Sequence, residues 1–158
     1  MAKNHELGTI LLADDNDLDV ELTLEALGES KVANPIVVVK DGAEALDFLY
    51  RRGKYASRDA CNPIVILLDI KMPKVNGLEV LGKLKSDPSL KSIPAVMLTS
   101  SAEDPDVTES YGLGANAYVV KPVKFQDFAP AVAAIGKFWA VVNAPPPDDC
   151  QPGFLTTD

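Results

Sequence analysis

Residues 64–69 read Ile-Val-Ile-Leu-Leu-Asp, and this stretch decides the fold. Five aliphatic residues in a row, rich in β-branched side chains, are typical of a parallel strand that is buried on both faces. Asp69 therefore stands at the carboxyl end of a strand, at the edge where α/β sheets bind ligands. The apolar run at residues 9–13 ends in the same way, at Asp14 and Asp15. We expect these carboxylates to meet at one edge of the sheet, where a divalent cation would offset their mutual repulsion.

Short apolar runs alternate with segments of helical period along the whole chain. The helical segments carry their apolar residues three or four positions apart. This alternation predicts an α/β fold with a parallel sheet, right-handed crossovers and helices on both faces. Pro130 would interrupt a helix that began at Lys124, so we expect the last helix to begin near Asp127 or to bend. The expected strands are residues 9–13, 36–39, 64–68, 95–98 and 117–120.

The composition is that of a globular protein of one domain, large enough to bury a core, since 47% of the 158 residues are hydrophobic and 24% are charged. No apolar stretch approaches the roughly 18 to 20 residues of a membrane-spanning helix, and the amino terminus has no apolar region of signal-peptide type. We therefore expect a cytoplasmic protein without membrane contact. The net charge of −8 argues against nucleic acid as a partner, because nucleic-acid affinity rests on cationic contacts with phosphate.

We expect the chain to divide into a flexible amino terminus at residues 1–6, a folded domain at 7–142 and a proline-rich tail at 143–158. The prolines of the tail favour extended backbone. The two cysteines, Cys61 and Cys150, are far apart in the sequence and have no C-x-x-C spacing. They are therefore expected to be free thiols.

Four chemically useful groups follow four of the expected strands. The pair Asp14-Asp15 follows the first strand, Asp69 the third, Thr99 the fourth and Lys121 the fifth. A carboxylate can act as a nucleophile and form an acyl phosphate, while a lysine and a metal ion neutralise the charge on the phosphoryl oxygens. Acids, a hydroxyl and an ammonium on one rim therefore suit the handling of a metal-bound phosphoryl group.

At these positions the sequence closely resembles the receiver domains of two-component response regulators, over about residues 7–142. The resemblance is carried by the acidic pair and by three motifs: Asp-Ile-Lys-Met-Pro-x-x-x-Gly at 69–77, Leu-Thr-Ser-Ser at 98–101 and Tyr-Val-Val-Lys-Pro at 118–122. It implies a doubly wound, flavodoxin-like sheet of five strands in the order 2-1-3-4-5. It also implies a single-domain response regulator that signals by conformational switching and protein contact.

The resemblance implies that Asp69 is the phosphoacceptor, fed by a sensor histidine kinase in a Mg²⁺-dependent reaction. Asp15, Asp69 and the backbone carbonyl of Lys71 would bind Mg²⁺ (or Mn²⁺) directly, and Asp14 would assist. Such a protein promotes its own phosphorylation and dephosphorylation but is not a multiple-turnover enzyme.

The resemblance also implies a set of switch residues. Lys121 would contact the phosphoryl group, Thr99 would be drawn toward it, and Tyr118 would change its rotamer as Thr99 moves. The positions of Lys71 and Ser101 flank, in this family, the path of the water that attacks the acyl phosphate.

Finer features resemble the single-domain regulators that are partnered with bacterial phytochromes. These features are the loop containing residues 52–55, the segment 110–116, and Phe138-Trp139 followed by prolines. They imply a phytochrome-like kinase and a downstream protein target. Phe138 and Trp139 either cover the bottom of the core or form an exposed aromatic patch, and we favour a patch that builds a homodimer.

Two other functions fit part of the sequence. Asp15-Asn16-Asp17 supplies the Asp-x-Asp of a haloacid-dehalogenase-like phosphatase, but the later acidic pair of such an enzyme would have to be Asp148-Asp149 in the tail. A degenerate receiver would act as a binding module without phosphorylation. The complete set of Asp14, Asp15, Asp69, Thr99 and Lys121 argues against that alternative.

Overall fold

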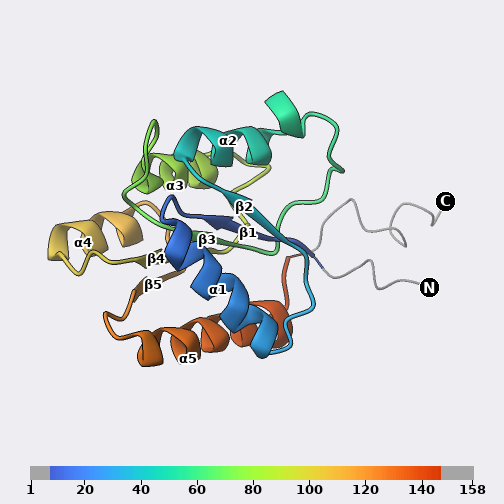
Figure 1. Cartoon of the computed structure of the whole chain (residues 1–158). Helices are drawn as coiled ribbons and strands as arrows, with labels where there is room; N and C mark the ends of the chain where they lie inside the picture. The colour runs from blue at the N-terminus through green and yellow to red at the C-terminus, as the bar shows by residue number, and fades with distance from the viewer. Residues whose placement is uncertain (1–7, 147–158) are drawn as a thin grey trace.

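The computed structural model describes residues 8–146, and its five strands form one sheet in the order β2-β1-β3-β4-β5 (Figure 1). Every pair of neighbouring strands is parallel. The fold and strand order expected from the sequence are therefore confirmed. The strands are β1 (Ile10–Ala13), β2 (Ile36–Val39), β3 (Val65–Leu68), β4 (Ala95–Thr99) and β5 (Ala117–Val120).

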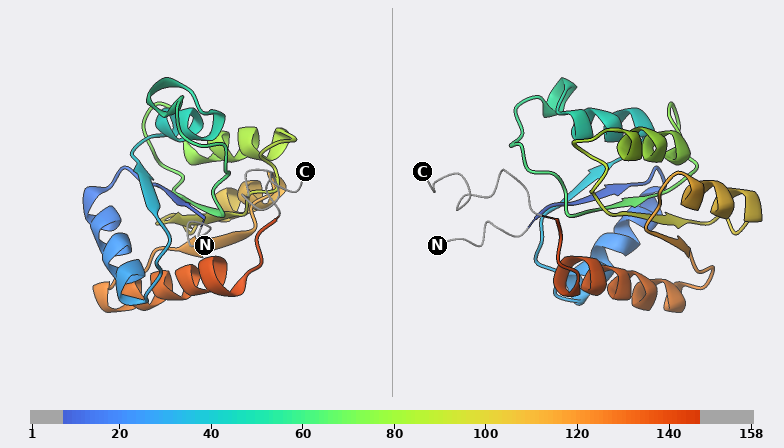
Figure 2. Two further views of the ribbon diagram at one scale, coloured as in Figure 1. Left: turned by 90° about the vertical axis from the view of Figure 1, so that its right-hand side faces the viewer. Right: turned by 180° about the vertical axis from the view of Figure 1, so that it is seen from behind.

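Helices cover both faces of the sheet. Helices α1 and α5 pack together on one face, and α2 and α3 lie side by side on the other (Figures 1 and 2). Helix α4 contacts α3 and β5. The helices are α1 (Asp17–Glu29), α2 (Gly42–Tyr50), α3 (Gly77–Ser86), α4 (Asp104–Gly112) and α5 (Phe125–Gly136), with a 3₁₀ turn η2 (Gly53–Tyr55) and a π-helical segment η3 (Lys137–Val142).

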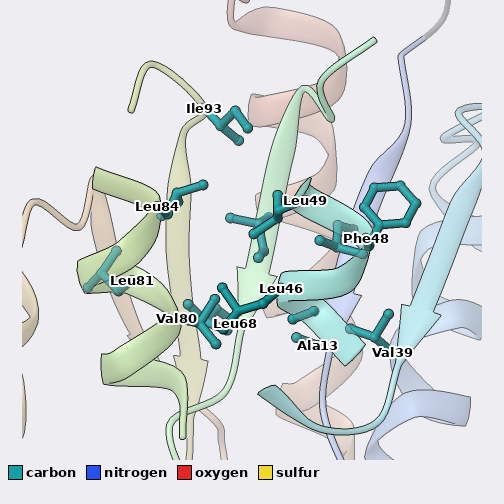
Figure 3. Close-up of a cluster of buried hydrophobic side chains, with 14 of the residues drawn as sticks. Ala13, Val39, Leu46, Phe48, Leu49, Leu68, Val80, Leu81, Leu84 and Ile93 are labelled. Atoms are coloured by element: carbon teal, nitrogen blue, oxygen red, sulfur yellow. The ribbon is translucent and has the colours of Figure 1, made fainter. Parts of the chain in front are cut away.

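The sheet separates two apolar cores, because successive side chains of a strand point to opposite faces. Ile66 and Leu68 of β3 belong to the core under α2 and α3, whereas Val65 and Leu67 belong to the core under α1 and α5. Figure 3 shows the first core, where side chains of α2 and α3 meet those of the strands. Since both faces are covered, β1, β3 and β4 are buried along their whole length, as their unbroken apolar sequences predicted.

The last helix begins close to its expected start, and it contains the proline that prompted the expectation. Helix α5 begins at Phe125, two residues before the expected start at Asp127, and Pro130 lies inside it. Proline removes a single helical hydrogen bond, the one to the carbonyl four residues earlier, and burial of Phe128 and Val132 on either side of it holds the helix against the sheet. After Gly136 the chain continues as η3, which closes with a bond from the Asn143 N–H to the carbonyl of Phe138.

The long loop after α2 is tied to the domain. The hydroxyl of Tyr55 donates to the Glu44 carboxylate at 2.7 Å, and its ring meets Phe48 edge-on at 5.1 Å. The guanidinium of Arg58 stacks over the Phe48 ring at 4.2 Å and donates to the Phe48 carbonyl. Polar residues thus hold a segment that the sequence marks only as a long connection.

The structure corrects the expectation of free thiols. Cys61 is disulfide-bonded, and Cys150 lies outside the described residues. The expectation rested on the lack of C-x-x-C spacing, which does not exclude a disulfide. Residues 1–6 and most of the tail, 147–158, also lie outside the described part. Within residues 8–146 we find no helix both long and apolar enough to cross a bilayer.

Candidate functional site

Three carboxylates converge at the carboxyl edge of the sheet. Oxygen atoms of Asp14, Asp15 and Asp69 all lie within 4.8 Å of one another. The cause is register: Ala13 and Leu68, the last residues of β1 and β3, are paired, so the acids that follow them are neighbours. Asp14 and Asp69 are buried, whereas Asp15 is exposed. Three carboxylates with one open side suit Mg²⁺, which prefers oxygen ligands and retains several waters.

Both oxygens of Asp14 are engaged. Its Oδ1 accepts from the Asn16 N–H at 3.0 Å, and its Oδ2 accepts from the Lys121 ammonium at 2.8 Å. Burial raises the pKa of Asp14 above its ordinary value, although these two hydrogen bonds lower it, and the charge of Asp69 raises it further. Burial thus disfavours the charged form of this carboxylate, and a cation bound beside it would favour that form.

Asp69 is positioned by contacts with the loop that follows it and by the close approach of Gly77 to its backbone. Its Oδ1 accepts from the Ile70 N–H at 2.8 Å, and its Oδ2 lies 3.2 Å from the Lys121 ammonium. A Cβ at Gly77 would lie 2.0 Å from the carbonyl oxygen of Asp69, so only glycine lets α3 begin so close to the end of β3. Lys71 lies in this loop with its side chain exposed, and the ligand role of its carbonyl stays a prediction.

Lys121 follows β5, where its N–H donates to the carbonyl of Thr99 at 2.7 Å. Its ammonium donates to Asp14 and Asp19 at 2.8 Å each and to Asp69 at 3.2 Å. Burial lowers the pKa of Lys121, but the hydrogen bonds to Asp14 and Asp19 and the charge of Asp69 outweigh burial and raise it above its usual value. The lysine is therefore a permanent cation at the site.

Sequence reasoning missed Asp19. The residue lies in the first turn of α1, where an acid is ordinarily explained by the helix dipole. One signal was available: Asp19 falls one helical turn after Asp15, on the stretch that leaves the acidic edge. The contact with Lys121 bridges 102 residues of sequence, so no local pattern reveals it.

The proposed switch residues are linked through Ser101. Thr99 ends β4 and is buried, and its Oγ1 accepts weakly from the Ser101 N–H at 3.4 Å. The hydroxyl of Tyr118 donates to the Ser101 carbonyl at 2.8 Å, and the Ser101 hydroxyl donates to the carboxylate of Asp106 in α4. Burial raises the pKa of Tyr118. The loop between β4 and α4 thus connects the two predicted switch residues, whose roles stay predictions.

Phe138 and Trp139 lie in η3, apart from the acidic edge in sequence, with their rings in edge contact at 5.0 Å. Trp139 is partly buried and packs against the core under α1 and α5, whereas Phe138 is 47% exposed. The sequence left open whether this aromatic pair covers the core or forms an exposed patch. In the structure Trp139 covers the core and Phe138 is accessible.

A doubly wound sheet that places a carboxylate trio and a buried lysine at its carboxyl edge defines the phosphoreceiver class of signalling proteins. The chain belongs to the response regulator receiver domain family, whose model matches residues 10–133. It is 38% identical over 130 residues to the response regulator Rcp1 of Synechocystis sp., which covers 82% of this chain and 87% of Rcp1.

Solved structures support the same assignment. The Mn²⁺-bound form of Rcp1 has a TM-score of 0.84 at 36% identity, covering 89% of this chain and 99% of that one. The phosphorylated cyanobacterial phytochrome response regulator RcpA has a TM-score of 0.83 at 39% identity, with 89% and 99% covered. The bacteriophytochrome response regulator RtBRR is 59% identical, with a TM-score of 0.72, and 89% and 85% covered.

Membership in this family means that the chain is a response regulator, phosphorylated on aspartate in a reaction that depends on Mg²⁺. The acidic trio supplies oxygen ligands of the kind that Mg²⁺ and Mn²⁺ take. The comparisons lend no support to a phosphatase or to a phosphorylation-independent binding module. Asp148-Asp149, on which the phosphatase alternative depends, lies outside the described residues.

Proposed function

We propose that Asp69 is the phosphoacceptor, and that Asp14, Asp15, Asp69 and the carbonyl of Lys71 hold the cation. The observation that carries this proposal is that the three carboxylates and the Lys121 ammonium lie together at the carboxyl edge of the sheet. Asp69 stands within 3.2 Å of the Lys121 ammonium on one side and within the acidic trio on the other. Phosphoryl transfer to a carboxylate requires positive charge beside the nucleophile, which Lys121 supplies directly and which the trio would supply by binding a cation.

In the proposed reaction, a carboxylate oxygen of Asp69 attacks the phosphorus of a kinase phosphohistidine. The oxygen–phosphorus bond forms as the phosphorus–nitrogen bond breaks, and the bond electrons leave with the imidazole. Bound Mg²⁺ would neutralise charge on the phosphoryl oxygens. Lys121 donates hydrogen bonds to one of those oxygens, and since it carries its proton throughout, it acts by charge and not by proton transfer.

The product is an acyl phosphate on Asp69 that later hydrolyses, so the protein is a switch and not a multiple-turnover enzyme. The new charge attracts Thr99 and Lys121, and a shift of Thr99 moves Ser101, which carries the hydroxyl contact of Tyr118. The surface of α4, β5 and α5 is thereby presented to a downstream protein.

The names of the relatives favour a phytochrome-type histidine kinase as the donor. Rcp1-like and bacteriophytochrome regulators cover most of this chain, and identity to RtBRR reaches 59%. We place the reaction in the cytoplasm, because the ATP that feeds histidine kinases is there.

A phosphotransfer assay tests this function. The purified chain is mixed with a bacterial phytochrome kinase that carries a radiolabelled phosphohistidine. We expect the label to move to the chain in Mg²⁺, to be lost in alkali or hydroxylamine as an acyl phosphate is, and to fall more than about tenfold with excess chelator. Transfer that is indifferent to chelation, or a label that survives alkali, contradicts the proposal.

We further propose that the protein forms a homodimer through η3. Phe138, Val141 and Val142 expose 47%, 65% and 62% of their surface on one short segment, and exposed apolar clusters of this kind mark interaction sites. Phe138→Ser is expected to lower the dimer fraction in sedimentation velocity runs. Leu18→Ser is the matched control, since Leu18 is an exposed apolar residue of α1. A monomer at all concentrations, or equal effects of the two variants, contradicts a dimer through η3.

A further inference from the structure

Among the described residues, three carboxylates share the Lys121 ammonium, and one of them stands outside the acidic trio. Asp19 accepts from Lys121 at 2.8 Å, as closely as Asp14 does. Its position is fixed by α1: the Asp19 N–H donates to Asn16 Oδ1 at 2.9 Å, and its carbonyl accepts from the Thr23 hydroxyl at 2.7 Å. The Asp19 side chain is 26% exposed, so the contact is partly shielded from water.

The other two partners of Lys121 have competing uses. Asp14 and Asp69 each offer Oδ2 to Lys121 and have Oδ1 occupied by a backbone N–H, from Asn16 and Ile70 respectively. A cation among the trio draws on these same carboxylates. A phosphoryl group on Asp69 also converts that carboxylate into an acyl phosphate, so the oxygen that Lys121 contacts changes and the negative charge moves onto the phosphoryl oxygens. Asp19 alone of the three is unaffected by either event.

We propose that Asp19 is a positioning residue for Lys121. It holds the ammonium at the edge of the sheet while Asp14 turns to the cation and Asp69 becomes phosphorylated, so that Lys121 meets the phosphoryl oxygens from a defined place. Asp19 touches neither the cation nor the phosphoryl group and acts only through the lysine. This inference rests on the proposed role of Asp69 as phosphoacceptor.

The first turn of α1 contains its own control. Asp17 is an acid of the same turn, 86% exposed, and it pairs with Lys40 instead of Lys121. Asp17→Ala removes the same charge and the same interaction with the helix dipole as Asp19→Ala. Any difference between the two variants therefore reports the contact with Lys121.

The experiment measures the rate at which acetyl phosphate labels the full chain at saturating Mg²⁺. We expect Asp19→Ala to be slower than the parent chain by about fivefold to tenfold, because a mispositioned charged donor loses much of its effect. Asp17→Ala should stay within about twofold, as exposed charges contribute little. Should Asp19→Ala fail to fold, Asp19→Asn keeps the shape, loses the charge and is expected to be slowed as well.

A double-mutant cycle separates positioning from a general structural effect. In the background of Lys121→Ala, adding Asp19→Ala should change the rate by less than about twofold, since the group through which Asp19 acts is gone. Equal rates for Asp19→Ala and the parent chain, or the same slowing with and without Lys121, overturn the inference. A parent chain that takes up no phosphate overturns the proposed function itself, whereas a labelled parent with an unslowed Asp19→Ala overturns only the role of Asp19.

Discussion

Asp69→Asn is expected to abolish phosphoryl uptake, with labelling by a phosphorylated kinase or by acetyl phosphate reduced by more than about a hundredfold. An amide has no anionic oxygen and cannot form an acyl phosphate. Asparagine has the size of aspartate, and its Oδ1 can still accept from the Ile70 N–H, the contact that Asp69 makes at 2.8 Å. The fold should therefore survive. Removal of the Asp69 charge relieves its repulsion of Asp14 but also weakens its pairing with Lys121, so the denaturant concentration at which the variant unfolds should change little.

Asp47→Asn is the matched control for this loss. Asp47 lies in α2, where it pairs with Arg52 at 2.8 Å, and it makes no contribution to the acidic trio. It should be labelled at the rate of the parent chain. Label that remains on Asp69→Asn and maps to Asp14 or Asp15 would transfer the role of phosphoacceptor to another carboxylate and contradict our assignment.

Lys121→Ala is expected to destabilise the protein in the absence of a divalent cation by about 3 to 5 kcal/mol. Asp14 is only 1% exposed and would lose the charged donor at 2.8 Å, while Asp19 and Asp69 would lose the ammonium that separates their charges. The free energy of unfolding, measured by urea titration with chelator present, reports this loss. Lys137→Ala removes the same charge from an exposed position and should change stability by less than about 0.5 kcal/mol.

Mg²⁺ should restore much of the stability of Lys121→Ala. The cation binds the folded state and takes over the oxygens that the lysine held, and binding to the folded state alone always stabilises it. Calorimetric titration should also show tighter Mg²⁺ binding by the variant than by the parent chain, because Lys121 no longer competes for Asp14 and Asp69. An equal loss of stability with and without Mg²⁺ would show that the lysine and the cation do not share these carboxylates.

The sequence predicts the acidic edge because the end of a buried strand can be recognised from a few neighbouring residues. An apolar run that stops at Asp14 or Asp69 marks both the strand and its carboxyl end, and parallel topology then places the ends together. The motif around Lys121 works in the same way. The pairing of Ala13 with Leu68 is not written in either strand alone, and the structure supplies it. Register is strongly specified where a strand is buried, because a shift by one residue would turn its apolar side chains to the other face.

The contact that the sequence did not reveal joins residues that are far apart in the chain and close together in the fold. Asp19 lies in α1 and Lys121 follows β5, 102 residues later, so nothing near Asp19 in the sequence indicates the lysine. The sequence also contained no signal for the bond of Cys61 or for the π-helical segment after Gly136. Pro130 served better, because the expected start near Asp127 lies within two residues of the observed start at Phe125.

The tyrosine contact at Ser101 has a consequence for how such a protein diversifies. The hydroxyl of Tyr118 donates to the main-chain carbonyl of Ser101. The side-chain hydroxyl of Ser101 donates to the carboxylate of Asp106. An exchange of the serine for a residue without a hydroxyl leaves the main-chain acceptor for the tyrosine, and removes the side-chain contacts with Asp106 and with the Glu103 N–H. A single substitution at residue 101 during evolution can therefore change how strongly α4 is bound to the loop. The main-chain contacts that connect Thr99 with Tyr118 would remain.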